Sequence, residues 1–263
     1  MSDGAPAWWV VTDLDGTLLD HAYDWSAAAA TLARLGRHGI PVIPCTSKTA
    51  EEVRVFRREA GLRDPFIVEN GGAIHGEDQR GEWRMVLGAD AARLRNELTL
   101  LADRAGLRLR PLAACSVAEV RALTGLDRAA AERARRREWS VPFLLEEPAR
   151  PGAWADLEAA AAARGLKLLQ GNRLAHLIDA ASDKGLALAA LRRRCGGPAT
   201  RVLALGDSPN DRALLEAADV AVVVPGAAGP HPEFRSALAE GRYRLAPAPH
   251  ARGWAAAVAE LLF

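Results

Sequence analysis

An apolar run that ends abruptly in two carboxylates constrains the fold of this chain more than any other feature. Residues 8–12 read Trp-Trp-Val-Val-Thr, and Asp13, Asp15 and Gly16 follow almost at once. A short apolar run bounded by a glycine turn is typical of a buried strand in an α/β sheet. In such sheets ligands bind beyond the carboxyl ends of the strands, where both carboxylates are expected. Two residues apart on an extended segment, they share one face and repel, which predicts a metal site, an acid–base pair, or both.

The same pattern of apolar run, polar loop and helix recurs along the chain. The expected strands are residues 8–12, 40–44, 66–68, 201–205 and 220–224, and the expected helices between them are 26–38, 49–60, 183–194 and 212–217. Repeated units of this kind predict a parallel sheet with helical crossovers.

A block in the middle of the chain breaks this rhythm. It mixes helices, one of which starts with a capping box at Ser116, with paired strand candidates at 166–169 and 174–178. The predicted fold is therefore α/β, a Rossmann-like doubly wound parallel sheet core with an inserted α+β cap domain. The predicted core comprises residues 1–85 and 181–263, and the predicted cap residues 86–180.

Charge and composition exclude several classes of protein. The 263 residues carry a formal net charge of only +1, so no overall basic field attracts nucleic acid or a membrane surface. The three cysteines are too widely spaced for a disulfide framework or a zinc site. No apolar run reaches the ~18 residues of a membrane span. We expect a cytoplasmic protein with a small-molecule substrate, without nucleic acid or membrane as partner, either a monomer or a homodimer.

Four polar clusters follow the expected strands or begin the expected helices: Asp13/Asp15, Thr46/Ser47/Lys48, Lys184, and Asp207/Asn210/Asp211. Each cluster alone fits a helix cap or an Asx turn about as well as a functional site. Together they converge on one chemistry, because carboxylates hold Mg²⁺, hydroxyl and amide groups hold phosphate oxygens, and a lysine neutralises charge.

These clusters carry a resemblance to a known family. Residues 13–18, Asp-Leu-Asp-Gly-Thr-Leu, and residues 206–211, Gly-Asp-Ser-Pro-Asn-Asp, resemble the first and fourth motifs of the haloacid dehalogenase phosphatases. Thr46 and Lys184 stand where the second and third motifs of that superfamily belong. The large insertion between them resembles the subgroup that has an α/β cap.

A closer resemblance, over most of the chain, is to the mannosyl-3-phosphoglycerate phosphatases. It rests on residues 46–49, 66–72, 123–126, 134–138, 171–173 with His176, and 183–185. It implies Mg²⁺-dependent hydrolysis of mannosyl-3-phosphoglycerate to mannosylglycerate and phosphate, a step of compatible-solute synthesis. A glucosyl-3-phosphoglycerate phosphatase or a broader sugar phosphatase is the nearest alternative. A phosphomannomutase-type phosphotransferase and a non-catalytic binding module are more distant ones.

The resemblance also implies roles for the core residues. Asp13 would be the nucleophile that forms an aspartyl-phosphate, a role for which an ionised carboxylate needs positioning more than activation. Asp15 would carry the proton, and Thr46 and Lys184 would hold the phosphoryl oxygens. Mg²⁺ would lie on Asp13, the backbone carbonyl of Asp15 and Asp207, with Asp211 as outer support.

The remaining candidates are predicted substrate contacts: Ser47, Lys48, Asn70, Gly71, Arg137, Arg173, His176 and Asn210. Arg137 is favoured because the glycerate end of the substrate carries a carboxylate, which arginine binds bidentately. A purely structural role remains an alternative for several of these residues. Lys48 fits a solvated surface lysine, Asn70 and Gly71 a hairpin turn, and His176 a core histidine.

Overall fold

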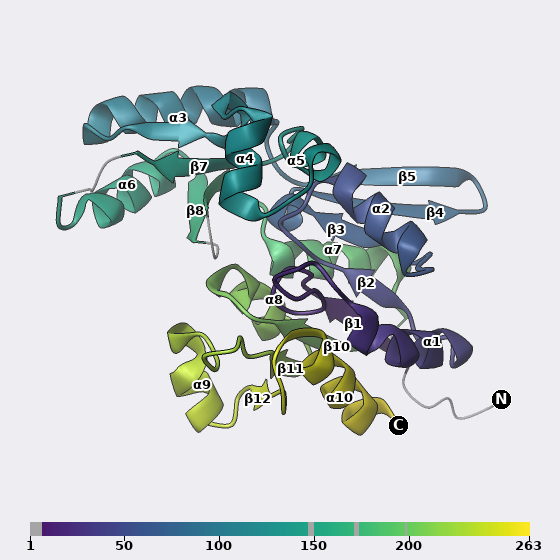
Figure 1. Ribbon diagram of the computed structural model, residues 1–263. Helices are drawn as coiled ribbons and strands as arrows, with labels where there is room; N and C mark the ends of the chain where they lie inside the picture. The colour runs from purple at the N-terminus through teal and green to yellow at the C-terminus, as the bar shows by residue number, and fades with distance from the viewer. Residues whose placement is uncertain (1–6, 147–149, 171–173, 198) are drawn as a thin grey trace.

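A five-stranded parallel sheet lies at the centre of the computed structural model, which describes residues 7–146, 150–170, 174–197 and 199–263 (Figure 1). Its order is β12-β11-β10-β1-β2. The strands are β1 (Trp8–Thr12), β2 (Val42–Pro44), β10 (Arg201–Gly206), β11 (Val220–Val223) and β12 (Arg244–Leu245). Every neighbouring pair is parallel, which confirms the predicted parallel core.

Helices cover both faces of this sheet, as a doubly wound fold requires. Alternate residues of β1 point to opposite faces. Val10 packs in one core cluster with residues of the helices α1 (Ala29–Arg37), α2 (Ala50–Glu59) and α10 (His250–Leu262). Trp9 and Val11 pack in the other with residues of α7 (Lys184–Cys195), α8 (Arg212–Glu216) and α9 (Arg235–Ala239). The short 3-10 helices are η1 (Ser26–Ala28), η2 (Glu69–Gly71), η3 (Leu112–Ala114), η4 (Pro209–Asp211) and η5 (Pro232–Phe234).

The strand predicted at residues 66–68 belongs to a second sheet. β3 (Phe66–Val68), β4 (Ala73–Asp78) and β5 (Gly81–Val86) form a three-stranded antiparallel sheet in that order. β3 is linked to the parallel sheet by an isolated parallel bridge between Cys45 and Ile67. The expected place of this strand in the parallel sheet was wrong, because the turn at η2 reverses the chain and starts the antiparallel strand β4, which the sequence pattern did not indicate.

The cap is a four-stranded antiparallel sheet with helices packed on it (Figure 1). Its order is β6 (Leu109–Pro111), β7 (Val141–Leu145), β9 (Ala175–Asp179) and β8 (Leu166–Gln170). The predicted pairing of the last two strands is confirmed, and α3 (Ala91–Ala105) and α6 (Ala153–Ala162) bury leucines against this sheet. The shorter helices α4 (Val117–Thr124) and α5 (Arg128–Ala134) lie toward the core, and the expected capping box of Ser116 is present. The boundaries 85/86 and 180/181 remain predictions.

Across the described ranges, every helix is too short or too polar to cross a lipid bilayer.

Candidate active site

The site lies at the edge of the parallel sheet where strands end. Asp13 directly follows β1, Thr46 lies two residues after β2, and Asp207 follows β10. β1 and β10 are neighbours, and the chain continues from β1 to β2 on one side and from β10 to β11 on the other. This is the position where an open α/β sheet forms a ligand crevice. The polar residues that the sequence analysis grouped are therefore brought together by the strand order.

Lys184 joins two of these carboxylates in the interior. It is the first residue of α7 and is fully buried, and its Nζ lies 2.6 Å from Asp13 Oδ1 and 2.6 Å from Asp211 Oδ1. Burial opposes the charge of Lys184, but the two carboxylates outweigh burial and raise its pKa. Burial raises the pKa of Asp13, Lys184 opposes that rise, and Asp211 and Asp207 add to it. Lys184 therefore holds Asp13 in place through a buried, charged hydrogen bond.

A glycine makes room for the third carboxylate. Gly16 has a φ of +90°, and a Cβ at this position would lie 2.5 Å from Asp207 Oδ2. Thr17 Oγ1 donates to Asp207 Oδ1 at 3.0 Å. Only glycine adopts that backbone without strain while leaving the space that Asp207 occupies. The Gly-Thr pair after the carboxylates thus positions Asp207 from the opposite end of the chain.

The donor set fits a hard divalent cation. Asp13, Asp207 and Asp211 each present an oxygen within 4.8 Å of the others. Three carboxylates beside one ammonium leave an excess of negative charge, and oxygen ligands of this kind suit Mg²⁺. Asp211 already accepts from Lys184 through Oδ1 and from the backbone N–H groups of Asp207 and Ser208 through Oδ2, which favours the outer position predicted for it. Ligation by the backbone carbonyl of Asp15 stays a prediction.

Lys48 is buried against the second carboxylate. Its Nζ lies 2.9 Å from Asp15 Oδ2, 3.7 Å from Glu52 Oε1 and 4.8 Å from the centre of the Tyr23 ring. The side chain is only 11 % exposed, so the alternative of a solvated surface lysine is wrong. Burial opposes its charge, but Asp15 and Glu52 outweigh burial and raise the pKa of Lys48. This lysine therefore places positive charge beside Asp15.

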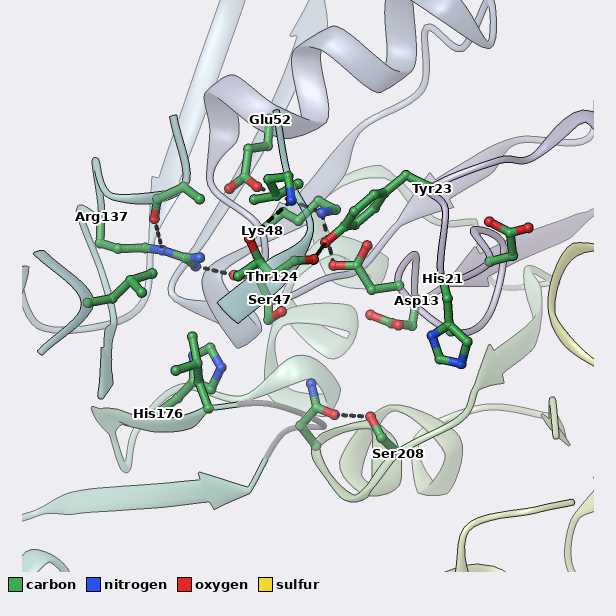
Figure 2. Close-up of a pocket in the computed structure, with 18 residues that line it drawn as sticks. Asp13, His21, Tyr23, Ser47, Lys48, Glu52, Thr124, Arg137, His176 and Ser208 are labelled. Atoms are coloured by element: carbon green, nitrogen blue, oxygen red, sulfur yellow. Dashed lines mark hydrogen bonds and ion pairs between the residues drawn. The ribbon is translucent and has the colours of Figure 1, made fainter. Parts of the chain in front are cut away.

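A cavity of about 260 Å³ lies between core and cap, and Asp13, Asp15 and Lys48 form part of its wall (Figure 2). Its core wall comprises Asp13, Asp15, Gly16, Asp20, His21, Tyr23, Ser47, Lys48, Glu52, Ser208 and Asn210. Its cap wall comprises Leu112, Thr124, Leu126, Ala134, Arg137, Leu174 and His176. Among the described residues, the predicted site residues outside this lining are Thr46, Asn70, Gly71, Lys184, Asp207 and Asp211. The cavity exposes both leading carboxylates to a ligand, with Lys184 behind Asp13.

Two predicted cap residues reach this cavity. Arg137 donates through Nε to the carbonyl of Ala134 at 2.8 Å and through Nη1 to the carbonyl of Ser47 in the core. His176 is 6 % exposed; burial, Arg137 and Lys184 lower its pKa to about 3, so its ring is neutral at pH 7. His176 is therefore buried, as a core histidine would be, and it also lines the cavity, as a substrate contact would. Arg173 lies outside the described residues.

Asn70 and Gly71 form the turn between the antiparallel strands β3 and β4, which agrees with the hairpin alternative. Asn70 is fully buried, and its Oδ1 accepts from Asn210 Nδ2 at 3.0 Å. A Cβ on Gly71 would lie 2.2 Å from the carbonyl oxygen of Asp183, so this turn packs tightly on the start of α7. Asn210 lines the cavity, whereas Asn70 supports it from behind.

Several lining residues were missed by the sequence analysis. Tyr23 donates from its hydroxyl to the carbonyl of Thr124 in the cap at 2.7 Å, and both residues line the cavity. No motif spacing marks Tyr23. Glu52 carried one signal, because Thr49 and Glu52 form a capping box at the start of α2. Burial opposes the charge of Glu52, but Lys48 and Arg137 outweigh it and lower its pKa.

Fold and site together are those of a phosphatase built on a haloacid dehalogenase-like core. The family model for haloacid dehalogenase-like hydrolases matches residues 10–92, and that for sucrose-6F-phosphate phosphohydrolase matches residues 113–259. A curated relative from Persephonella marina is 33 % identical over 231 residues, covering 82 % of this chain and 84 % of the relative. That relative is named glucosyl-3-phosphoglycerate/mannosyl-3-phosphoglycerate phosphatase. The chain belongs to the haloacid dehalogenase-like hydrolases, as the resemblance of its motifs implied.

Solved structures support the same fold. A haloacid dehalogenase-like hydrolase from B. subtilis is 19 % identical, with a TM-score of 0.69 and coverage of 97 % of this chain and 99 % of that one. The sucrose-phosphatase from Synechocystis is 21 % identical, with a TM-score of 0.68 and coverage of 97 % and 98 %. At these identities the similarity establishes the architecture of core and cap.

Proposed function

We propose that this chain is a Mg²⁺-dependent phosphomonoester hydrolase that converts mannosyl-3-phosphoglycerate to mannosylglycerate and phosphate. The observation that carries the proposal is the cavity in which Asp13 and Asp15 of the core face Arg137 of the cap. Such a cavity offers a reaction centre at one wall and a carboxylate-binding guanidinium at the other. The name of the Persephonella marina relative supports the same substrate class.

The proposed reaction has two steps. Asp13 attacks phosphorus, and its bond to phosphorus forms while the bond to the glycerate oxygen breaks. Asp15 gives a proton to that leaving oxygen. In the second step Asp15 takes a proton from water, which attacks the aspartyl-phosphate and releases phosphate. Lys184, 2.6 Å from Asp13 Oδ1, fixes the nucleophile and adds positive charge near the reacting group.

The proposed contacts divide between core and cap. Ser47, Lys48 and Asn210 line the cavity beside the carboxylates and present polar groups to the phosphoryl end. Arg137 binds the glycerate carboxylate, and neutral His176 offers a hydrogen bond to a sugar hydroxyl. Thr46, Asn70 and Gly71 do not line the cavity, and they support the residues that do through the loops to which they belong.

Mg²⁺ would be held by Asp13 and Asp207, with the Asp15 carbonyl and Asp211 in support, and it would supply positive charge to the phosphoryl oxygens. We expect that stripping divalent cations with EDTA lowers phosphate release by about 100-fold, because such charge stabilisation is worth several kcal/mol. Added Mg²⁺ is expected to restore the rate. Turnover that survives complete chelation would contradict the metal requirement, and dialysed enzyme without EDTA serves as the control.

A substrate panel tests the assigned reaction. We expect mannosyl-3-phosphoglycerate to show a kcat/KM about tenfold or more above those of mannose 6-phosphate and glucose 6-phosphate, because hexose phosphates lack the carboxylate for Arg137. The measurement is phosphate release at matched concentrations. Equal turnover of the hexose phosphates would rule out the glycerate assignment.

The glucosyl analogue is the second candidate, because the name of the relative includes both sugars. It belongs in the same panel, since the two substrates differ only in sugar stereochemistry. Detection of phosphoryl transfer to an added sugar in place of free phosphate would favour a phosphotransferase.

A further inference from the structure

A left-handed turn joins the catalytic loops to the cap. Glu69, Asn70 and Gly71 have φ values of 51°, 58° and 96° in succession. Two consecutive non-glycine residues in this region are uncommon, because Cβ crowds the backbone. Such strained turns persist only where surrounding contacts hold them, and they occur often at functional sites. The contacts of this turn therefore indicate what it does.

On the core side, the turn is bonded to the loop after β2. The backbone N–H of Glu69 donates to the carbonyl of Lys48 at 3.0 Å, and that of Asn70 donates to the carbonyl of Thr46 at 3.0 Å. The Asn70 side chain is bonded to Asn210, as described above. The turn is thus fixed to two of the loops that carry the site.

On the cap side, one carboxylate makes the connection. Glu69 is 1 % exposed and accepts three hydrogen bonds from consecutive cap residues: Glu138 N at 2.9 Å, Trp139 N at 3.0 Å and Ser140 Oγ at 2.7 Å. A Cβ on Gly72 would lie 2.3 Å from Trp139 Cβ, so the glycine after the turn lets this segment sit directly on the core. Residues 138–140 are thus clamped to the core by these hydrogen bonds, although they lead directly into β7 of the cap sheet.

The clamped segment begins one residue after Arg137. Figure 2 shows the Arg137 side chain reaching toward Ser47 across the cavity, where its guanidinium donates to the Ser47 carbonyl. Burial raises the pKa of Glu69, and the charge of Arg137 opposes that rise, so the two side chains also act on each other through charge. The position of Arg137 therefore depends on the clamp.

We propose that Glu69 is a positioning residue, which holds residues 137–140 against the catalytic loops so that Arg137 meets the carboxylate of the substrate. The inference rests on the proposed function for the identity of that carboxylate. It makes substrate recognition by the cap depend on a core residue that does not touch the substrate. Glu69 was not among the residues singled out in the sequence.

The test is Glu69→Gln. A glutamine has nearly the same shape, but its NH₂ group must face the backbone N–H of either Glu138 or Trp139, so two donors oppose each other. We expect the ratio of kcat/KM for mannosyl-3-phosphoglycerate to that for p-nitrophenyl phosphate to fall about tenfold, chiefly through KM for the larger substrate. The second substrate has no carboxylate for Arg137 to bind. The measurement is steady-state kinetics on both substrates.

A double mutant separates positioning from a merely structural role. If Glu69 acts through Arg137, Glu69→Gln adds little to the loss that Arg137→Ala causes, because the interaction is already gone. The inference would be overturned if the losses of kcat/KM from the two single substitutions multiply fully in the double mutant. It would also be overturned if Glu69→Gln lowers kcat/KM equally for both substrates.

Two further variants serve as controls. Glu138→Gln makes the same isosteric change across the contact, but this side chain is half exposed and pairs with Arg84, so the wild-type ratio is expected. Ser140→Ala removes one of the three hydrogen bonds to Glu69 and is expected to lower the ratio of the two kcat/KM values by a smaller factor. If Glu69→Gln does not fold, an unchanged ratio in Ser140→Ala would overturn the inference. A wild-type enzyme that fails to hydrolyse phosphoglycerate glycosides overturns the proposed function itself, whereas wild-type turnover with an unchanged ratio in the variants overturns only the role of Glu69.

Discussion

Replacing Asp13 by asparagine is expected to reduce phosphate release by on the order of 10⁶-fold, the scale of loss seen when a hydrolase loses its nucleophile. The amide has nearly the same shape but cannot form the aspartyl-phosphate. Stability is expected to be maintained, because burial and the neighbouring carboxylates raise the pKa of Asp13 and so disfavour its charged form in the fold. Lys184 keeps Asp211 as a partner. Phosphate release and thermal unfolding of the same preparation measure both effects.

Asp64→Asn is the matched control for this variant. Asp64 is also partly buried, its pKa is also raised by burial, and its Oδ2 accepts from the backbone N–H of Val42. It does not line the cavity, so wild-type turnover is expected. A large loss of activity in the control, or a drop in melting temperature for Asp13→Asn that accounts for its inactivity, would show that the loss reports folding and not chemistry.

The core of the site was predictable because it depends on strand ends. Asp13, Thr46 and Asp207 each follow an apolar run, and the carboxyl ends of parallel strands meet at one edge whatever lies between them. The position of Lys184 at the start of a helix was also predictable, because the helix expected at residues 183–194 begins there. Periodicity alone did not supply the exact neighbours, such as Lys184 between Asp13 and Asp211, because these depend on rotamers and on the strand order.

Other features escaped the sequence for physical reasons. β4 follows a turn in which Glu69 adopts a left-handed conformation, and glutamate is not a residue type that favours it, so nothing in the sequence indicated that an antiparallel strand starts here. The direction of the Glu69 side chain follows from that backbone and could not be read from residue type. Tyr23 meets Thr124 only because the cap folds back over the core. Contacts between segments about one hundred residues apart leave no local pattern.

The cap and core are thus joined at the cavity by contacts of different kinds. The Tyr23 hydroxyl donates to the carbonyl of Thr124 in the cap, and the Arg137 guanidinium donates to the carbonyl of Ser47 in the core. Glu69 fixes the segment behind Arg137 through three donors. In the proposed reaction, the chemistry is concentrated in core groups, whereas the groups proposed to distinguish substrates come from the cap and are held by the core.

Removing the ammonium of Lys184 is expected to affect both stability and catalysis. Lys184→Met keeps an unbranched side chain in a fully buried position but leaves Asp13 and Asp211 without their shared partner. Breaking a buried ion pair costs about 3–5 kcal/mol, which corresponds to a melting temperature lower by roughly 10 °C for a chain of this size. Phosphate release is expected to fall by about 10³-fold or more, because the proposed nucleophile, Asp13, loses the hydrogen bond that holds it and the reacting group loses nearby positive charge.

The loss of stability in Lys184→Met is expected to depend on pH. Without Lys184, nothing opposes the burial and the neighbouring carboxylates that raise the pKa of Asp13, so this pKa lies further above its unfolded value in the variant. Folding then binds protons, so the stability of Lys184→Met rises as the pH falls and the gap to the wild type narrows. Lys167→Met is the matched control, because Lys167 pairs with Asp183 at 2.9 Å but is 38 % exposed, and such a pair contributes about 1 kcal/mol or less. Equal losses of melting temperature in the two variants, or a gap that widens in acid, would contradict the placement of Lys184 as the buried counter-ion of the nucleophile.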